Sequence, residues 1–209
     1  RFARLQSLME LVSVVRKTKA EAPVPAFLHW ILEAPWAGLG GSDTAFLPPM
    51  DRRELAAELA RDQEGWFSGR PVWEGRCRAT GPLPRQADHP LVADALAKRG
   101  NGVLARQLAR LVEVAAAPGT LKETLANEPV AREPVGPGAG LGTVETARGR
   151  LDHYAEVAEG GIRRYRILAP TEWNFHPQGA LVQGLRGLPL PGDAGTQETV
   201  RLHVDSLDP

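Results

Sequence analysis

Hydrophobic residues change their spacing near residue 150, and this change limits the folds that the chain can adopt. Over 90–117 apolar side chains recur at helical intervals, mostly on one stripe that a Gly-Asn-Gly sequence at 100–102 interrupts. Over 151–157 and 162–168 apolar and polar residues alternate, with two glycines at 160–161 between the runs. Such alternation about a glycine pair is typical of a β-hairpin. The sequence therefore predicts a mainly α fold with a small antiparallel β-hairpin, an α+β class.

Other segments complete the expected organisation of one domain over residues 1–209. Asp51 and Thr196 have side chains that favour helix N-caps. Segment 129–142 contains prolines and glycines with almost no apolar content, so we expect a flexible loop before the hairpin region. Further helices are expected at 2–15, 52–62, 177–185 and 196–207. The chain starts and stops within or directly after helical patterns, so we expect both ends to be truncated.

The charge balance and cysteine usage restrict the class of protein. Lys+Arg and Asp+Glu both number 25, and this neutrality gives no basic footprint for nucleic acid or an anionic membrane surface. Hydrophobic residues make up 43% of the chain, enough for a sizeable core, and no apolar run reaches membrane-spanning length. The single cysteine excludes an internal disulfide. We expect a cytoplasmic protein with neither nucleic-acid nor membrane partners.

Metal-ligand and catalytic motifs are absent from the sequence. The five histidines are scattered without ligand spacing, so neither a metal site nor a catalytic residue is predicted. Cys77 lies between Arg76 and Arg78, whose charges would lower a thiol pKa. No base is paired with it in the sequence, so an incidental loop thiol is favoured over a reactive one.

Two segments at the outer ends of the predicted hairpin suggest a binding site. Arg148 comes just before the first strand, and Pro170 and Thr171 follow the second. Because a hairpin brings its outer ends together, these residues are expected to form a cradle for an anion or polar ligand. The alternative, favoured by composition alone, is an ordinary salt bridge for Arg148, with Trp173 in the core and Asn174 capping a turn.

Four motifs in order resemble the C-terminal half of nickel–iron hydrogenase large subunits. Thr80-Gly-Pro-Leu-Pro-Arg85 is similar to the family's Gly-Pro-Leu-Ala-Arg element, and Glu145-Thr-Ala-Arg-Gly149 to its Pro-Arg-Gly element before a hairpin. Ala169-Pro-Thr-Glu-Trp-Asn174 is similar to the Pro-Ser/Thr-x-Trp-Asn element after it. Leu202-His-Val-Asp-Ser-Leu-Asp-Pro209 resembles the approach to the family's Cys-x-x-Cys tail. The resemblance implies the C-terminal part of a large-subunit-like fold.

The resemblance also implies roles for particular residues. In the family, the arginine lies above the metal site, and the Pro-Ser/Thr pair hydrogen-bonds the cyanides of an iron that carries two cyanides and one carbonyl. Carried over by motif, cofactor-binding roles fall on Arg148, Ala169, Pro170 and Thr171. Arginine and hydroxyl donors suit such an acceptor because metal-bound cyanide carries excess negative charge on nitrogen.

Departures from the family pattern favour its accessory branch. Ala147 replaces the usual proline, the motifs are closely spaced, and Glu-Trp-Asn-Phe-His-Pro at 172–177 resembles both hydrogen-sensing hydrogenases and HupK/HoxV-type accessory proteins. We therefore expect a catalytically inactive maturation scaffold that carries an iron–dicyano–carbonyl fragment without nickel. Its expected partners are other maturation factors and a hydrogenase large-subunit precursor. A hydrogen-cleaving or hydrogen-sensing large subunit and a helical interaction protein without metal function are the alternatives.

Overall fold

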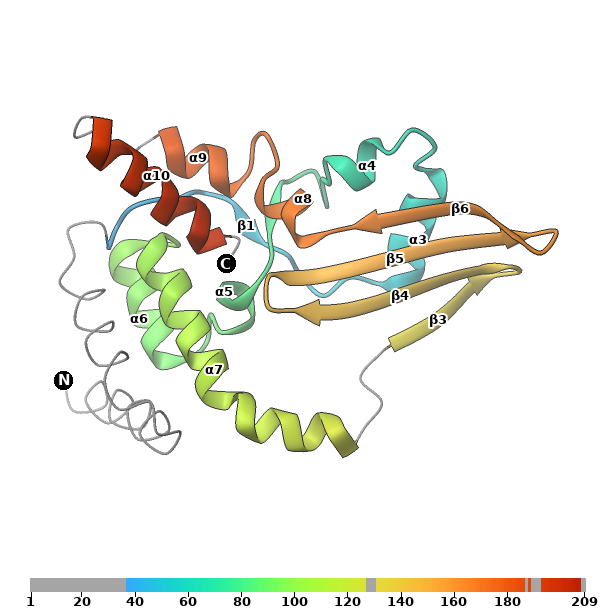
Figure 1. Ribbon diagram of the computed structural model, residues 1–209, viewed down its shortest axis with the longest axis horizontal. Helices are drawn as coiled ribbons and strands as arrows, with labels where there is room; N and C mark the ends of the chain where they lie inside the picture. The colour runs from blue at the N-terminus through green and yellow to red at the C-terminus, as the bar shows by residue number, and fades with distance from the viewer. Residues whose placement is uncertain (1–36, 127–130, 187, 189–192, 208–209) are drawn as a thin grey trace.

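The computed structural model describes residues 37–126, 131–186, 188 and 193–207 (Figure 1). The helix expected over 2–15 lies outside this part of the chain. The described elements follow one another as β1 (Ala45–Phe46), α3 (Arg52–Arg61), α4 (Trp66–Gly69), β2 (Arg78–Ala79), α5 (Pro82–Arg85), α6 (Pro90–Arg99), α7 (Val103–Ala126), β3 (Ala131–Gly136), β4 (Ala139–Thr146), β5 (Gly149–Ala158), β6 (Gly161–Leu168), α8 (Pro170–Asn174), α9 (Ala180–Arg186) and α10 (Asp193–Leu207).

The predicted hairpin is formed by β5 and β6 and belongs to a larger sheet. The strands pair antiparallel, with Asp152 opposite Leu168 and Tyr154 opposite Arg166. Two further strands extend the sheet in the order β3-β4-β5-β6. The α+β class is confirmed, with a four-stranded antiparallel meander in place of an isolated hairpin.

The flexible loop predicted over 129–142 is wrong for the residues that the structure describes. Most of them lie in β3 and β4, and only the turn between these strands is irregular. Leu141 is buried on the core face of β4, opposite Tyr154 of β5. Pro134 is tolerated because β3 is an edge strand with a register shift between Pro134 and Gly136. Pairing with β5 thus overrides the low strand propensity of the glycines and prolines.

The helical predictions hold in the middle of the chain and shift near its end. Asp51 caps α3 by accepting the Arg53 and Glu54 N–H groups, and Gly100, with φ of +70°, ends α6 before α7 begins. Thr196, the predicted cap of the last helix, lies inside α10. Residues 170–174 form the short helix α8, because Pro170 suits the first helical position, while Ala169 at the N-cap makes no side-chain cap hydrogen bond.

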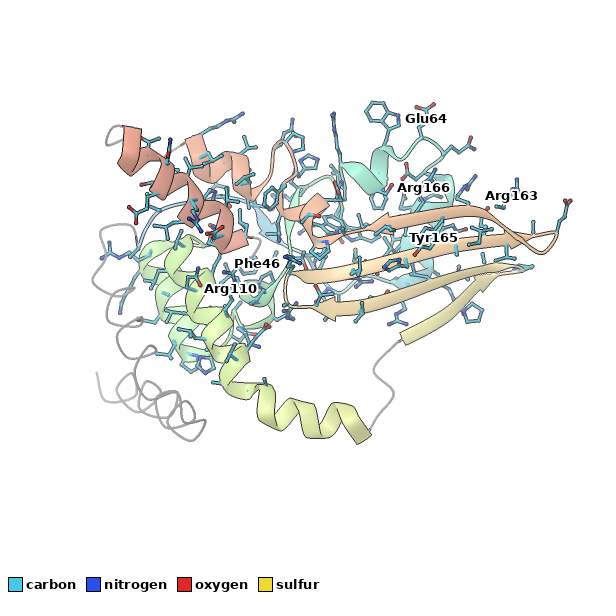
Figure 2. The ribbon with its side chains drawn as sticks, in the orientation of Figure 1. Phe46, Glu64, Arg110, Arg163, Tyr165 and Arg166 are labelled. Atoms are coloured by element: carbon cyan, nitrogen blue, oxygen red, sulfur yellow. The ribbon has the colours of Figure 1, made fainter. Side chains whose placement is uncertain are left out.

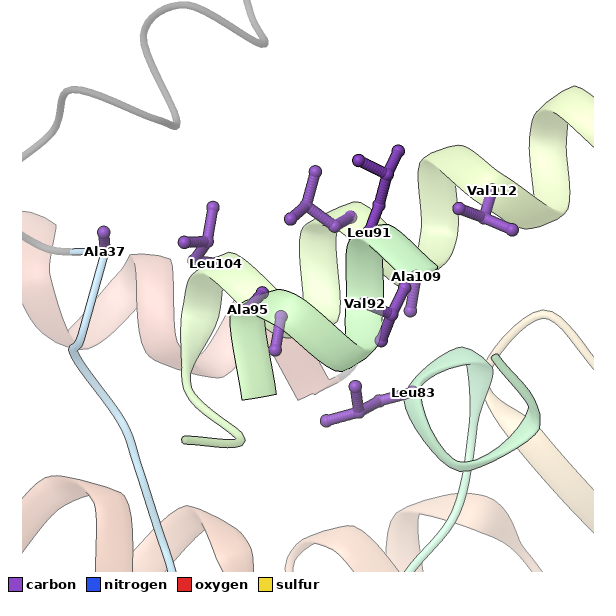
Figure 3. Packing of buried hydrophobic residues seen from close by; sticks show 10 residues of the cluster. Ala37, Leu83, Leu91, Val92, Ala95, Leu104, Ala109 and Val112 are labelled. Atoms are coloured by element: carbon purple, nitrogen blue, oxygen red, sulfur yellow. The ribbon is translucent and has the colours of Figure 1, made fainter. Parts of the chain in front are cut away.

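Two hydrophobic clusters hold the described elements together. The first lies between α5, α6 and α7, and Figure 3 shows its side chains interleaved. The second joins α3 to the sheet and α8, with Leu55, Leu141, Leu168 and Trp173 all at most 2% exposed. Helices α6, α7, α9 and α10 gather at one end of the sheet (Figure 1). Within the described ranges, no helix combines the length and apolarity needed to cross a membrane.

Candidate functional site

Thr80 lies where three distant segments of the chain meet. Its backbone N–H donates to Asn174 Oδ1 at 3.0 Å, and its Oγ1 accepts the Arg150 N–H at 3.0 Å. Gly149 rests directly against it, because a Cβ added there would lie 2.5 Å from Thr80 Cγ2. The end of β2, the start of β5 and the end of α8 therefore converge on one residue. Three of the four motifs singled out in the sequence thus come together.

Two glycines allow the backbones to approach at this junction. Gly149 has φ of +137°, and Gly81 has φ of +122°, where an added Cβ would stand only 3.0 Å from the Arg148 carbonyl oxygen. Side chains with a Cβ seldom adopt these φ values. The glycines of the Gly-Pro-Leu and Arg-Gly motifs are therefore needed for close contact between the segments.

Arg148 lies in the turn between β4 and β5. The Thr146 Oγ1 accepts the N–H groups of Arg148 and Gly149, at 3.2 and 3.3 Å, and donates to the Gly149 carbonyl oxygen at 2.8 Å. These bonds fix the backbone of the turn beside Gly81. The Arg148 side chain itself is exposed, so the residues that the structure describes do not enclose its guanidinium.

Ala169, Pro170 and Thr171 form the N-cap and first turn of α8. Pro170 is buried, whereas Ala169 and Thr171 are half-buried. At the other end of α8, Asn174 bonds Thr80 and donates from Nδ2 to the Leu207 carbonyl oxygen at 3.4 Å. Asn174 therefore joins three segments rather than capping its own turn.

Arg148 and the first turn of α8 are connected to each other through Thr80. The Arg148 backbone lies beside Gly81, the residue after Thr80, and α8 reaches Thr80 through Asn174. Trp173 is fully buried in the core, as the structural alternative expected. The Arg148 backbone and the C-terminal end of α8 thus both meet the segment of Thr80 and Gly81, and the Arg148 side chain is exposed.

Arg150 adds a donor that the sequence analysis missed. Its Nε lies 3.0 Å from Oδ2 of the fully buried Asp152, which also accepts from Thr143 Oγ1 at 2.6 Å. The Arg150 Nη2 is buried and has no hydrogen-bond partner among the described residues. Buried donors are nearly always paired, so this one has capacity for a further acceptor. Only the three-dimensional arrangement distinguishes Arg150 from the other arginines of the chain.

Arg85 anchors the junction from the helical side. It donates to Glu113 of α7 through Nε and Nη2, at 2.6 and 3.0 Å, and through Nη1 to Glu145 at 2.8 Å. Burial alone would lower the pKa of Arg85, but the hydrogen bonds and charges of Glu113 and Glu145 raise it. The Arg85 side chain thus fixes the turn at Arg148 relative to α7.

Cys77 has a base beside it that the sequence did not reveal. Its Sγ lies 3.1 Å from Nδ1 of His176, which is 99 residues away along the chain. The same Nδ1 also accepts the Gln178 N–H at 3.1 Å, so the thiol and this amide share one acceptor nitrogen. Burial raises the pKa of Cys77, and burial together with the charge of Arg70 lowers the pKa of His176.

Burial thus outweighs the flanking arginines, which argues against the reactive-thiol alternative. Both shifts favour the neutral forms, so Cys77 and His176 form a neutral hydrogen-bonded pair at pH 7. No signal in the sequence links the two residues, because the fold alone brings them together. In the part of the chain that the structure describes, no three His, Cys, Asp or Glu side chains gather as a metal-ion site would require.

Comparison with known proteins places these motifs in a family. Residues 93–209 match the family described as nickel-dependent hydrogenase. The chain is 36% identical over 172 residues to the hydrogenase expression/formation protein HupK of Bradyrhizobium diazoefficiens, covering 80% of this chain and 46% of that protein. It is 32% identical over 163 residues to the hydrogenase expression/formation protein HoxV of Cupriavidus necator, covering 75% of this chain and 42% of that protein. The chain spans about half the length of the curated relatives it matches.

A solved structure shares the fold. The Ni-Fe-Se hydrogenase from D. vulgaris Hildenborough in the reduced state superposes with a TM-score of 0.51 at 23% sequence identity, over 72% of this chain and 38% of that one. This likeness confirms the expected fold of the hydrogenase type. With a family match over more than half of its length, the chain belongs to the nickel-dependent hydrogenase family.

Proposed function

We propose that this chain acts in hydrogenase maturation, as a scaffold that holds an iron–dicyano–carbonyl fragment and passes it to a hydrogenase large-subunit precursor. The observation that carries the proposal is the similarity to proteins named hydrogenase expression/formation proteins, which extends over 80% of the chain for HupK of Bradyrhizobium diazoefficiens. In this proposal the fragment is cargo, and the scaffold works in the cytoplasm with other maturation factors.

The geometry around Thr80 supports the proposal. Cyanide on iron presents a nitrogen acceptor, and a site for it needs hydrogen-bond donors held in fixed positions. Thr146 fixes the turn that carries Arg148, and the buried Nη2 of Arg150, two residues further on, offers an unused donor. Thr171 adds a hydroxyl in the first turn of α8.

Each residue has a separate part in the proposed cradle. Arg148 donates from its planar guanidinium to one cyanide, and Thr171 donates from its hydroxyl or N–H to the other. Pro170 and Ala169 hold the start of α8 in place. Because Arg148 is exposed in this chain, the cradle is open on one side, where cargo enters and leaves.

Infrared spectroscopy tests the proposal directly. The chain is produced with the complete maturation machinery and examined for cyanide and carbonyl stretches. We expect both bands in the wild-type protein, weaker bands in Arg148→Lys and loss of the bands in Arg148→Ala, because lysine keeps the charge but loses the planar fork of donors. Wild-type protein without bands would contradict the cargo, and unchanged bands in Arg148→Ala would contradict the role of that arginine.

An exposed arginine elsewhere in the sheet provides the matched control. Arg163 lies on β6, toward the far end of the sheet from Thr80 (Figure 2), and Arg163→Ala removes the same charge. We expect this variant to keep the wild-type bands. Hydrogen-dependent dye reduction by the purified chain with stoichiometric nickel would instead support the alternative, a hydrogen-cleaving large subunit.

A further inference from the structure

Arg106 of α7 is a buried cation that is bonded only to neutral groups. It is 5% exposed, and it donates from Nη2 to the Gly40 carbonyl oxygen at 3.1 Å and from Nη1 to Ser206 Oγ at 3.2 Å. Its Nη1 also lies 3.4 Å from Nδ1 of His203. None of these partners carries a negative charge.

His203 is held as a neutral acceptor in this cluster. Its Nε2 lies 3.0 Å from the Leu181 carbonyl oxygen and must donate to it, which leaves the lone pair on Nδ1 facing Arg106. Burial and the charge of Arg106 lower the pKa of His203. The imidazole therefore helps to solvate the guanidinium without neutralising it.

The positive charge of Arg106 is not offset by the described part of the molecule. Burial, followed by the charge of Arg110, lowers the pKa of Arg106 to about 9, so the side chain is still protonated at pH 7. The C-terminal end of α10 contributes roughly half a negative charge by its dipole, and Arg110 already donates there, to the Asp205 and Ser206 carbonyl oxygens at 2.8 Å each. A buried charge without a counter-charge is costly, and proteins usually supply one.

A small cavity adjoins this cluster. It has a volume of about 20 Å³ and is lined by Leu83, Arg106, Arg110 and Leu207 of α5, α7 and α10, together with Thr80 and other residues near β1 and β2. In Figure 2, Phe46 and Arg110, which both line the cavity, lie between the sheet and the helical part. A volume of this size accepts one water-sized species, which matches a monatomic anion but not phosphate or sulfate.

We infer that this cavity binds a single halide-sized monovalent anion beside Arg106. The ion supplies the missing counter-charge and locks α10 against α7. The cavity shares Thr80 with the junction beside Arg148, but its ligand is a different one, and the inference does not depend on the proposed function.

Thermal unfolding of the full chain tests the site with bromide as the probe. Sodium bromide is titrated against sodium gluconate at constant ionic strength, because gluconate is too large for the cavity. We expect a saturable rise in Tm of roughly 3–6 °C at a tenfold excess over the dissociation constant. Arg106→Met keeps the length of the side chain and should lose the response, whereas Arg163→Met, the exposed control, should keep it.

A second measurement keeps the inference testable if Arg106→Met does not fold. Crystals of the wild-type chain soaked in bromide should show anomalous density within hydrogen-bond distance of Arg106. Equal Tm in bromide and gluconate overturns the inference, and density without a Tm response would mean an adventitious ion only. A response that emerges only in Asp208→Asn would also overturn it, because a carboxylate of the chain itself would then fill the site.

Discussion

Gly149 lies against Thr80 so closely that a Cβ would stand 2.5 Å from Thr80 Cγ2 and 2.8 Å from Thr80 Oγ1. The contact joins the turn that carries Arg148 to the segment that carries Gly81. It also positions Thr80 to accept the Arg150 N–H. The absence of a side chain at 149 is therefore as much a part of the candidate site as the arginines on either side.

Gly149→Ala is expected to destabilise the protein and to disturb the junction. The added methyl group must displace Thr80, and φ of +137° is strained for alanine. We expect a loss of about 1–3 kcal/mol in the free energy of unfolding, measured by urea denaturation. Gly140→Ala on β4 is the control, because nothing lies within 4 Å of its added Cβ. If the two variants were equally stable, Thr80 would move away from the added methyl group at little cost in free energy, and the contact would not require glycine.

Asn174→Ala is expected to separate α8 from its two neighbours. Asn174 is 2% exposed and bonds the Thr80 N–H and the Leu207 carbonyl oxygen, so truncation leaves both groups unpaired. We expect a loss of about 1–3 kcal/mol in stability and faster hydrogen exchange at the Thr80 amide. Thr171→Ala, in the same helix, leaves these two bonds in place and should keep slow exchange at Thr80. Unchanged exchange in Asn174→Ala would mean that water replaces the amide.

The protein is expected to lose stability as the pH falls below about 6.5, in part through His203. Because the folded-state pKa of His203 is lowered, the unfolded chain binds its proton first as the pH falls. The contribution of His203 is therefore complete above pH 6.5 and decreases by up to about 1.4 kcal/mol per pH unit below it. Urea denaturation between pH 5 and 8 measures this slope, and His203→Asn should reduce it. The same slope in both proteins would assign the acid sensitivity to other groups, such as His176.

Local patterns in the sequence were sufficient for part of the fold. Alternation over 151–168 predicted the β5–β6 pairing, although the apolar side chains of Ile162, Tyr165 and Ile167 are exposed and the core face carries Tyr154 and Leu168. The glycines and prolines of β3 and β4 have low strand propensity, so no local pattern indicated these strands. Their pairing depends on β5 and on Leu141 packing in the core, which local spacing does not encode.

The candidate site was predictable only where motifs were contiguous. Arg148 and Ala169–Thr171 were identified from short motifs, and the hairpin placed them at the same end of the sheet. The spare donor of Arg150, the buried charge of Arg106 and the contact between Cys77 and His176 all depend on contacts between distant segments. Residue type alone gives no measure of burial for an arginine or a cysteine.

Cys77 is expected to react slowly with iodoacetamide in the folded protein. Burial raises its thiol pKa, and the thiolate is the reactive form, so less of it is present at pH 8 than in the unfolded chain. The rate should increase as the pH rises past the ordinary thiol value. Because Cys77 is the one cysteine of the chain, mass spectrometry of the alkylated protein follows this thiol alone, and Cys77→Ser should show no labelling.

The partner of the thiol provides the second arm of this experiment. His176 is 6% exposed and lies against Cys77, so His176→Ala opens the site to water and removes the acceptor at Nδ1. We expect alkylation of this variant to be faster than that of the wild-type protein and closer to the rate in urea. If folded wild-type protein reacts faster than the urea-unfolded chain, the imidazole and the flanking arginines activate the thiol, and the neutral pair is wrong. Because burial and activation by His176 move the rate in opposite directions, the sign of the change is enough to decide between them.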